Sequence, residues 1–268
     1  MNRKIGVAAA GVVISLAAVT GCSQTASNVV LSPISVLRAA LAAASKDNTV
    51  KATESVTGNR QNYQMSVAQQ FSPPKFSERA TVGVGTTGVL KMSEIYDGTK
   101  LYLKVPQLSA LAGRKPWVQI GPSNVGRADS SIQSLLGAAK DMAPNSSIAP
   151  LLASRDLKSL GTETVDGVRA TCYSGTLDAA QVASMLPTNG LTADQVQQIK
   201  QSFQQDTITS ETLDVWINSE NLPVRQESLA TTKVGTVTTT IGYSGWGVPV
   251  SITDPPGSEV GMLKSSAF

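Results

Sequence analysis

Alternation of apolar and polar residues with a period of two is the sequence feature that most limits how this 268-residue chain can fold. It runs with interruptions from Val50 to Pro256 and is clearest from Tyr63 to Phe71. Successive side chains of a strand point to opposite faces, so the pattern predicts strands with one buried face. Asp97-Gly98 and Asp166-Gly167 lie between such segments and favour tight hairpin turns. The sequence therefore predicts a meander of about ten or eleven antiparallel strands.

Helical spacing interrupts the strand pattern. Ser32 followed by Pro33 provides a cap and a proline at the first helical position, which predicts an amphipathic helix from Pro33 to Ser45. A second helix is predicted over 132–142 and a shorter helical turn over 148–153. Asp178 and Thr192 each precede a glutamine by three residues, the capping-box pattern of a helix start. Because an antiparallel sheet commonly has one dry face, these helices are its expected cover, and the fold class is α+β.

The first 22 residues form a distinct segment. Asn2-Arg3-Lys4 is positively charged, Ile5 to Val19 is apolar, and small residues precede Cys22. A positive start, an apolar core and a small-residue end are the layout of a secretory signal. The cysteine makes the segment resemble a bacterial lipoprotein signal, which implies cleavage before Cys22, a diacylglycerol on its sulfur and acylation of the new amino terminus. A transmembrane anchor is the alternative, but the apolar run is short of the ~20 residues that a span needs.

These patterns divide the chain into four segments. In order they are a signal peptide (1–21), a lipidated cysteine with a flexible tether (22–31), one folded domain (32–257) and a loose C-terminal tail (258–268). The last strand of the domain is expected over 248–252. Two or more acyl chains hold a protein stably on a bilayer. The predicted location is therefore the extracytoplasmic side of the cell membrane, with a lipid anchor at Cys22.

Composition argues against several classes of function. Removal of residues 1–21 leaves 20 basic and 19 acidic residues, a balance unlike that of proteins that bind nucleic acid. The chain has no histidine, which removes Ser-His and Cys-His nucleophiles and the common zinc sites. The carboxylates considered for catalysis are Asp97, Asp166 and Asp178, and each lies at a turn or a helix start, where aspartate serves the backbone. We therefore expect a protein that is not an enzyme, with no metal site and no cofactor.

Cys172 is the only cysteine besides Cys22. With the sulfur of Cys22 alkylated, Cys172 has no partner within the chain, so no disulfide is expected. Its strand-like surroundings, from Val168 to Tyr173, favour a small buried apolar residue.

Several segments taken in order resemble one protein family. They are Ile95-Tyr-Asp-Gly-Thr-Lys-Leu-Tyr-Leu, Trp117-Val-Gln-Ile, Val165-Asp-Gly-Val-Arg-Ala-Thr-Cys-Tyr, Val215-Trp-Ile-Asn, Asn221-Leu-Pro-Val-Arg and Tyr243-Ser-Gly-Trp-Gly-Val-Pro-Val. Their order resembles that of the actinobacterial lipoproteins grouped with LppX and LprG, which share the LolA-like fold. The resemblance implies a single domain with a strongly curved antiparallel sheet, or incomplete β-barrel, and helices packed on its concave face. It also implies an apolar cavity for acyl chains and the carriage of lipids or glycolipids.

Apolar residues of the predicted strands are the candidates for the cavity wall. They are Met65, Val67, Phe71, Leu101, Leu103, Val215 and Ile217, and ordinary core packing is the alternative for each. Aromatic residues make up only 4% of the chain, so helices on a sheet this large either approach it closely or leave a cavity.

Two functions remain open at this point. The first is a monomeric, membrane-anchored protein that binds, and transfers, a lipid or glycolipid ligand. The second is a structural, protein-interaction or sensor lipoprotein of the same fold without a bound ligand. A continuous apolar cavity of several hundred Å³ would distinguish the first from the second.

Overall fold

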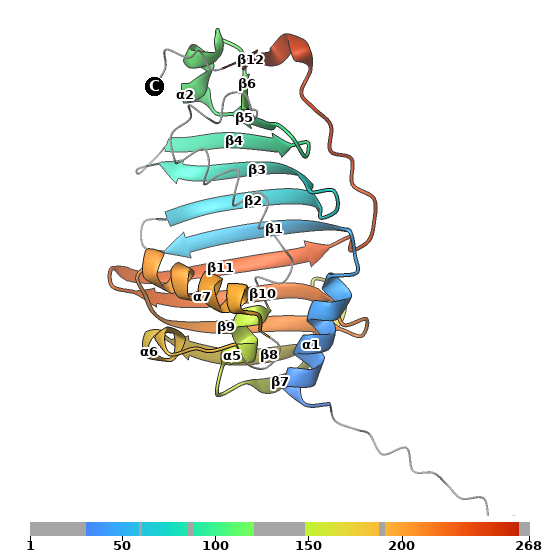
Figure 1. Ribbon diagram of the computed structural model, residues 1–268, viewed down its shortest axis with the longest axis vertical. Helices are drawn as coiled ribbons and strands as arrows, with labels where there is room; N and C mark the ends of the chain where they lie inside the picture. The colour runs from blue at the N-terminus through green and yellow to red at the C-terminus, as the bar shows by residue number, and fades with distance from the viewer. Residues whose placement is uncertain (1–30, 59–60, 85–87, 121–147, 188–190, 263–268) are drawn as a thin grey trace, which may run out of the picture. The chain divides into compact units, whose positions relative to one another are not determined.

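A single sheet of twelve strands organises the chain in the computed structural model, which describes residues 31–58, 61–84, 88–120, 148–187 and 191–262. The strands lie in the order β12-β6-β5-β4-β3-β2-β1-β11-β10-β9-β8-β7 (Figure 1). Their bounds are β1 Thr49–Gly58, β2 Gln61–Gln70, β3 Lys75–Val84, β4 Gly88–Tyr96, β5 Leu101–Lys104, β6 Trp117–Ile120, β7 Lys158–Val165, β8 Val168–Asp178, β9 Ile208–Asn218, β10 Pro223–Thr232, β11 Gly235–Ser244 and β12 Val260–Met262.

The strand pairing confirms the predicted antiparallel meander. Strands β1 to β6 pair in sequence, strands β7 to β11 do the same, and β1 joins the two runs by pairing with β11. Only β12 and β6 are parallel among the described pairs. The Asp166-Gly167 turn has positive φ at both residues, as a tight hairpin requires. At the edge, β7 carries an irregularity between Ser159 and Gly161.

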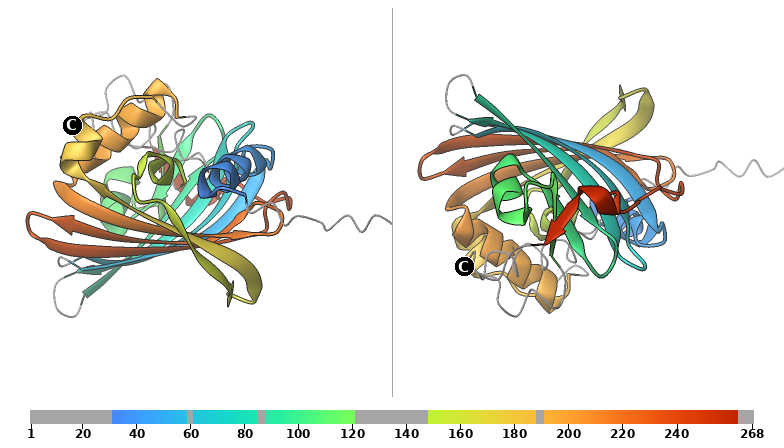
Figure 2. Two further views of the ribbon diagram at one scale, coloured as in Figure 1. Left: turned by 90° about the horizontal axis from the view of Figure 1, so that it is seen from below. Right: turned by 90° about the horizontal axis from the view of Figure 1, so that it is seen from above.

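Helices cover one face of the sheet. They are α1 Pro33–Ala44, α2 Pro106–Ser109, α5 Ala149–Ala153, α6 Ala179–Ala183 and α7 Ala193–Gln205, with 3-10 turns η1 Ala110–Ala112 and η3 Gly257–Glu259. Helix α5 packs on β8, α6 on β8 and β9, α7 on β9, and α1 against α5. Figure 2 shows these helices on the concave side, which we call the inner face, while the β7–β8 hairpin reaches toward the opposite, outer face. The predicted fold class is therefore confirmed.

The helix starts follow the predicted capping chemistry. The Ser32 side chain accepts a hydrogen bond from the backbone of Ser35, and Pro33 opens α1. The Asp178 side chain accepts from the backbone of Gln181 at the start of α6. Thr192 and Gln195 form a reciprocal capping box at α7. These caps orient short helices that could not persist alone, since isolated helices of this length are marginal in water.

Two apolar clusters lie on the inner face. The main core, beneath α1, α5, α6 and α7, contains Leu37, Leu151, Leu177, Phe203, Leu213 and Val215 among others. The small core, at the other end of the sheet, contains Phe76, Tyr96, Leu101, Leu103 and Ile120. Inner-face strand residues between the two cores are partly polar, and this stretch is where a ligand site can lie.

Two details of the C-terminal part differ from the sequence prediction. Residues 248–252 form no strand, so that prediction was wrong. The loose tail was expected from Ser258, yet residues 257–259 form η3 and β12 pairs with β6. A three-residue strand is too short for a periodic signal, and here the pairing depends on the small Gly261, whose added Cβ would clash with the backbone of Ala112. The helix predicted over 132–142 lies outside the described residues.

The close approach of α5 to the sheet generates the first prediction. A Cβ on Gly175 would lie 2.5 Å from Ser154 Oγ, at the C-terminal end of α5. We expect Gly175→Ala to lower the free energy of unfolding by about 1–3 kcal/mol, because a packed interface must shift to admit the methyl group. Urea unfolding monitored by tryptophan fluorescence measures this. Gly257→Ala is the matched control, since its Cβ would meet nothing within 4 Å, and an equal effect in both variants would contradict the explanation.

Candidate ligand-binding site

A cavity of about 440 Å³ lies on the inner face at the C-terminal end of α7. Strands β1, β2, β9, β10 and β11 form its floor. Its lining residues are Val56, Tyr63, Ser202, Gln205, Asp206, Ile208, Glu211, Ser228, Ala230, Thr232, Val237 and Thr239. Strand register brings many of them together, because Ser228, Thr239, Val56 and Tyr63 lie opposite one another in one transverse row. The cavity is thus built into the pairing of the strands.

Polar side chains in this cavity are held by hydrogen bonds. Ser228 Oγ donates to Glu211 Oε1 at 2.5 Å. Burial raises the pKa of Glu211, the hydrogen bond from Ser228 opposes this rise, and the charge of Asp206 adds to it. Tyr63 Oη donates to Glu54 Oε1 at 3.0 Å. The lining is therefore mostly carboxylate, amide and hydroxyl groups, and it differs from the apolar cavity that the sequence predicted. Its apolar residues are Val56, Ile208, Ala230 and Val237.

Three glutamates extend this acidic character along the inner face. Glu54 lies on β1, while Glu78 on β3 and Glu94 on β4 are directly opposite each other. Burial raises the pKa of each of them. For Glu78 the pKa reaches about 7, because burial is reinforced by the charges of Glu94 and Glu54. Like charges that face each other at close range favour the protonated form of one partner.

The charge of the cavity determines which ligands it can bind. The charged residues that line the inner cavity, Asp206 and Glu211, are both acidic. Among the described residues no group of three or more potential ligand side chains could hold a metal ion. No helix within the described ranges is long and apolar enough to cross a bilayer. Acidic oxygens in a partly dry cavity accept hydrogen bonds from hydroxyl and amine donors and disfavour anions.

The residues predicted for the cavity wall fall into separate places. Leu101 and Leu103 belong to the small core, with Val67 packed against it. Val215 and Ile217 belong to the main core. Met65 is half-buried on β2, and Phe71 is half-buried in the turn that follows that strand. None of the seven is among the residues that line the inner cavity.

Of the other residues singled out in the sequence, those that the structure describes serve the fold. Cys22 lies outside the described residues. Cys172 is buried with Val165, Ala170, Trp216 and Val224 in a third cluster, on the outer face. Burial raises the pKa of Cys172 to about 12, with further contributions from nearby carboxylates, so its thiol is a poor nucleophile. Asp97 accepts hydrogen bonds from the backbone of Thr99 and Lys100 in its turn.

The acidic residues of the inner face were missed by the sequence analysis. A usable signal was present, because Glu78 alternates in phase with Phe76 and Ala80 on β3 and so had to share their face. Glu211 carries the same signal, because it alternates in phase with Leu213 and Val215 on β9. Cavities between elements that are distant in sequence are not visible from periodicity alone.

The geometry defines the class of the fold as LolA-like: an open, curved, mostly antiparallel sheet with helices on its inner face. The crystal structure of LprF from Mycobacterium bovis matches it with a TM-score of 0.52 and 19% identity, over 84% of this chain and 97% of LprF. At this identity the likeness shows the fold alone. The resemblance to the actinobacterial lipoproteins grouped with LppX and LprG is therefore confirmed for the fold.

Sequence comparison finds relatives in Streptomyces. An uncharacterized 31.2 kDa protein encoded between rplA and rplJ in Streptomyces griseus is 29% identical over 153 residues, which are 57% of this chain and 50% of that protein. A Streptomyces coelicolor protein with a provisional lipoprotein name is 26% identical over 125 residues, 47% of this chain and 34% of that protein. The matches thus span half or less of these curated relatives. No family model matches the chain.

Protonation of Glu78 should couple stability to pH. The pKa of Glu78 is about 7 in the folded state against an ordinary 4.5. Its contribution to the free energy of unfolding is therefore fully present below pH 4.5 and is lost as the pH rises through 7. We expect the free energy of unfolding to fall between pH 5 and pH 8, with Glu78 contributing on the order of 1–3 kcal/mol. Urea unfolding across this range should show a shallower fall for Glu78→Gln.

Glu220→Gln is the control for this measurement, because Glu220 is exposed in the turn after β9. Its stability profile should follow that of the unmodified protein. A Glu78→Gln profile that also follows the unmodified protein would show that Glu78 does not titrate in this range.

Proposed function

We propose that this protein is a lipid-anchored lipoprotein of the extracytoplasmic membrane face that binds a lipid or glycolipid in the inner cavity. The observation that carries the proposal is the cavity of about 440 Å³ between α7 and the sheet. Ligand sites for small molecules typically measure about 300–1,000 Å³. The fold shared with LprF supports the same reading, since this architecture places helices over a curved face where a ligand can be enclosed.

In this proposal the apolar part of the ligand lies against the four apolar residues of the lining, and the polar residues bind its headgroup. Val56, Ile208, Ala230 and Val237 line the cavity, and the main core continues beside it through Ile208. Each methylene removed from water contributes about 0.8 kcal/mol, so shielding part of one acyl chain is sufficient for useful affinity. No covalent chemistry is required, and transfer between membranes would need only exchange of the ligand near the bilayer.

The polar residues of the lining determine which ligand headgroup is favoured. Glu211 and Asp206 would repel a phosphate in this partly dry site, whereas carboxylate oxygens accept hydrogen bonds from sugar hydroxyls. Tyr63 and Ser228 add hydroxyl groups at the same place. These charges favour a neutral, hydroxyl-bearing headgroup, such as that of a glycolipid, over an anionic phospholipid.

Lipid extracted from the full chain made in an actinobacterial host tests the proposal. Thr239→Trp places a large ring in the cavity, and we expect it to lower the ratio of bound lipid to protein roughly tenfold, since displacing two methylenes is enough for that loss. Native and solvent-extraction mass spectrometry measure the ratio. Thr238→Trp is the matched control, because its neighbouring position on β11 faces the outer side.

Two outcomes would contradict the proposal. Absence of extractable lipid from the unmodified protein would favour a structural or protein-interaction lipoprotein of the same fold. Equal lipid content in Thr239→Trp, Thr238→Trp and the unmodified protein would place the ligand elsewhere.

A further inference from the structure

Strand register places two arginines in one transverse row on the outer face. Arg225 of β10 lies opposite Gly242 of β11, which lies opposite Thr53 of β1. Thr53 lies opposite Ser66 of β2, and Ser66 lies opposite Arg79 of β3. Four interstrand steps separate the arginine backbones by about 19 Å. Only a glycine and two small hydroxyl residues lie between them.

This row forms the floor of a trough of about 530 Å³ on the outer face. A second row beside it contributes Thr240, Ser55, Gln64 and Thr81, which also lie opposite one another. Glu54 and Met65 border the trough too, although the register places their side chains on the inner face. The side chains that face the trough are therefore hydroxyl, amide and charged groups, with no large apolar residue among them.

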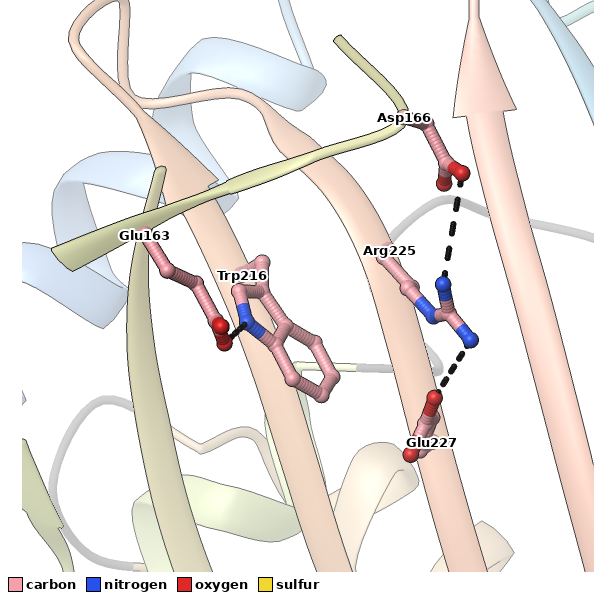
Figure 3. Close-up of polar contacts among 5 residues, drawn as sticks. All are labelled: Glu163, Asp166, Trp216, Arg225 and Glu227. Atoms are coloured by element: carbon pink, nitrogen blue, oxygen red, sulfur yellow. Dashed lines mark hydrogen bonds and ion pairs between the residues drawn. The ribbon is translucent and has the colours of Figure 1, made fainter. Parts of the chain in front are cut away.

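One end of the trough is pre-organised around Arg225 (Figure 3). Its guanidinium lies 2.6 Å from Glu227 and 4.0 Å from Asp166, and it is 5.9 Å from the centre of the Trp216 ring. Trp216 is fixed in turn, because its Nε1 donates to Glu163 Oε1 at 2.6 Å. Asp166 sits in the tight turn of the β7–β8 hairpin, which brings it over the outer face. Arg225 Nε is buried and has no hydrogen-bond partner among the described residues.

At the other end of the trough lies Arg79, whose positive charge is not neutralised by any described residue. Arg79 is exposed, and no hydrogen bond or ion pair involves its side chain within the described part of the chain. Strand alternation adds further cations to the same surface. The outer-face positions of β1 to β5 and β11 carry no carboxylate, and their charged residues are Lys51, Lys75, Arg79, Lys91 and Lys104. This surface therefore attracts anions over several strands.

We propose that the outer-face trough binds an acidic oligosaccharide that lies across strands β10, β11, β1, β2 and β3. Its hydroxyl groups would exchange hydrogen bonds with Thr53, Ser55, Gln64, Ser66 and Thr240, each of which can donate as well as accept. Its carboxylate or phosphate groups would pair with Arg79, whose charge no described residue neutralises. At the opposite end Arg225 is already paired with Glu227 and Asp166, and these carboxylates would accept hydrogen bonds from sugar hydroxyls. A peptide is disfavoured, because the trough lies on the face of the sheet rather than at a free edge and has no apolar pocket for side chains. The site is independent of the inner cavity and of the ligand proposed there.

Tetragalacturonic acid, which bears four carboxylates, is a suitable probe, with neutral maltotetraose as its matched control. Calorimetric titration of the full chain should detect tetragalacturonic acid with a Kd below about 1 mM at low salt. Raising NaCl from about 50 to about 200 mM should weaken binding, since exposed charge pairs are screened. Arg79→Gln should weaken it roughly tenfold by removing a charge-assisted contact.

Two further variants sharpen the test. Ser66→Tyr fills the trough with a residue that suits an exposed strand, so it should abolish binding without unfolding the protein. Lys233→Gln removes a cation at the exposed β10–β11 turn and should leave binding unchanged. The lipid content of Arg79→Gln and of Ser66→Tyr should equal that of the unmodified protein. This result would separate the proposal for the trough from the one for the inner cavity.

Several results would overturn the inference. They are equal affinity for maltotetraose, no binding of tetragalacturonic acid below about 1 mM, and unchanged binding in Arg79→Gln or Ser66→Tyr. Binding of the protein to phosphatidylglycerol vesicles that depends on Arg79, without binding of the oligosaccharide, would also overturn it and would assign the surface to the membrane.

Discussion

The hydrogen-bonded ladder between neighbouring strands is the constraint on which the rest of this structure depends. It joins all twelve described strands, with register irregularities in the β7–β8 and β9–β10 pairs, and it assigns each paired strand residue to one of the two faces of the sheet. A slip of one residue in any pair would exchange the faces of a whole strand. The main core, the inner cavity and the outer trough all require the same register, and none of them could be kept if it changed.

One result of this fixed register is that acidic and basic side chains lie on opposite faces of the sheet. Between β1 and β5 the inner positions hold Glu54, Glu78 and Glu94 and no cation, while the outer positions hold lysines and Arg79 and no carboxylate. A near-neutral overall balance hides this arrangement, because the two signs cancel in a sum over the chain. Each face can therefore recognise a different chemistry, the inner one neutral donors and the outer one anions.

Local signals explain what the sequence could predict. Alternation located the strands, and Asp166-Gly167 and Thr192 located a hairpin and a helix start because their effects reach only a few residues. The sites depend on contacts that no local pattern encodes. The inner cavity joins β2 to α7, and Arg79 shares a transverse row with Arg225 only because β1 pairs with β11. Val215 and Leu101 were expected to share one wall, yet they lie in different cores since their strands are far apart in the sheet.

The two ends of the sheet have a consequence for self-association. An open sheet exposes unpaired backbone groups at its edges, and these can recruit a second copy into a growing aggregate. Here one border is only three residues long, in β12, and the other is broken near Gly161 on β7, where φ is +111°. Neither border offers a long flat template. On the membrane surface proposed for this protein, neighbouring copies would meet often, and borders of this kind would offer them no long strand to pair with.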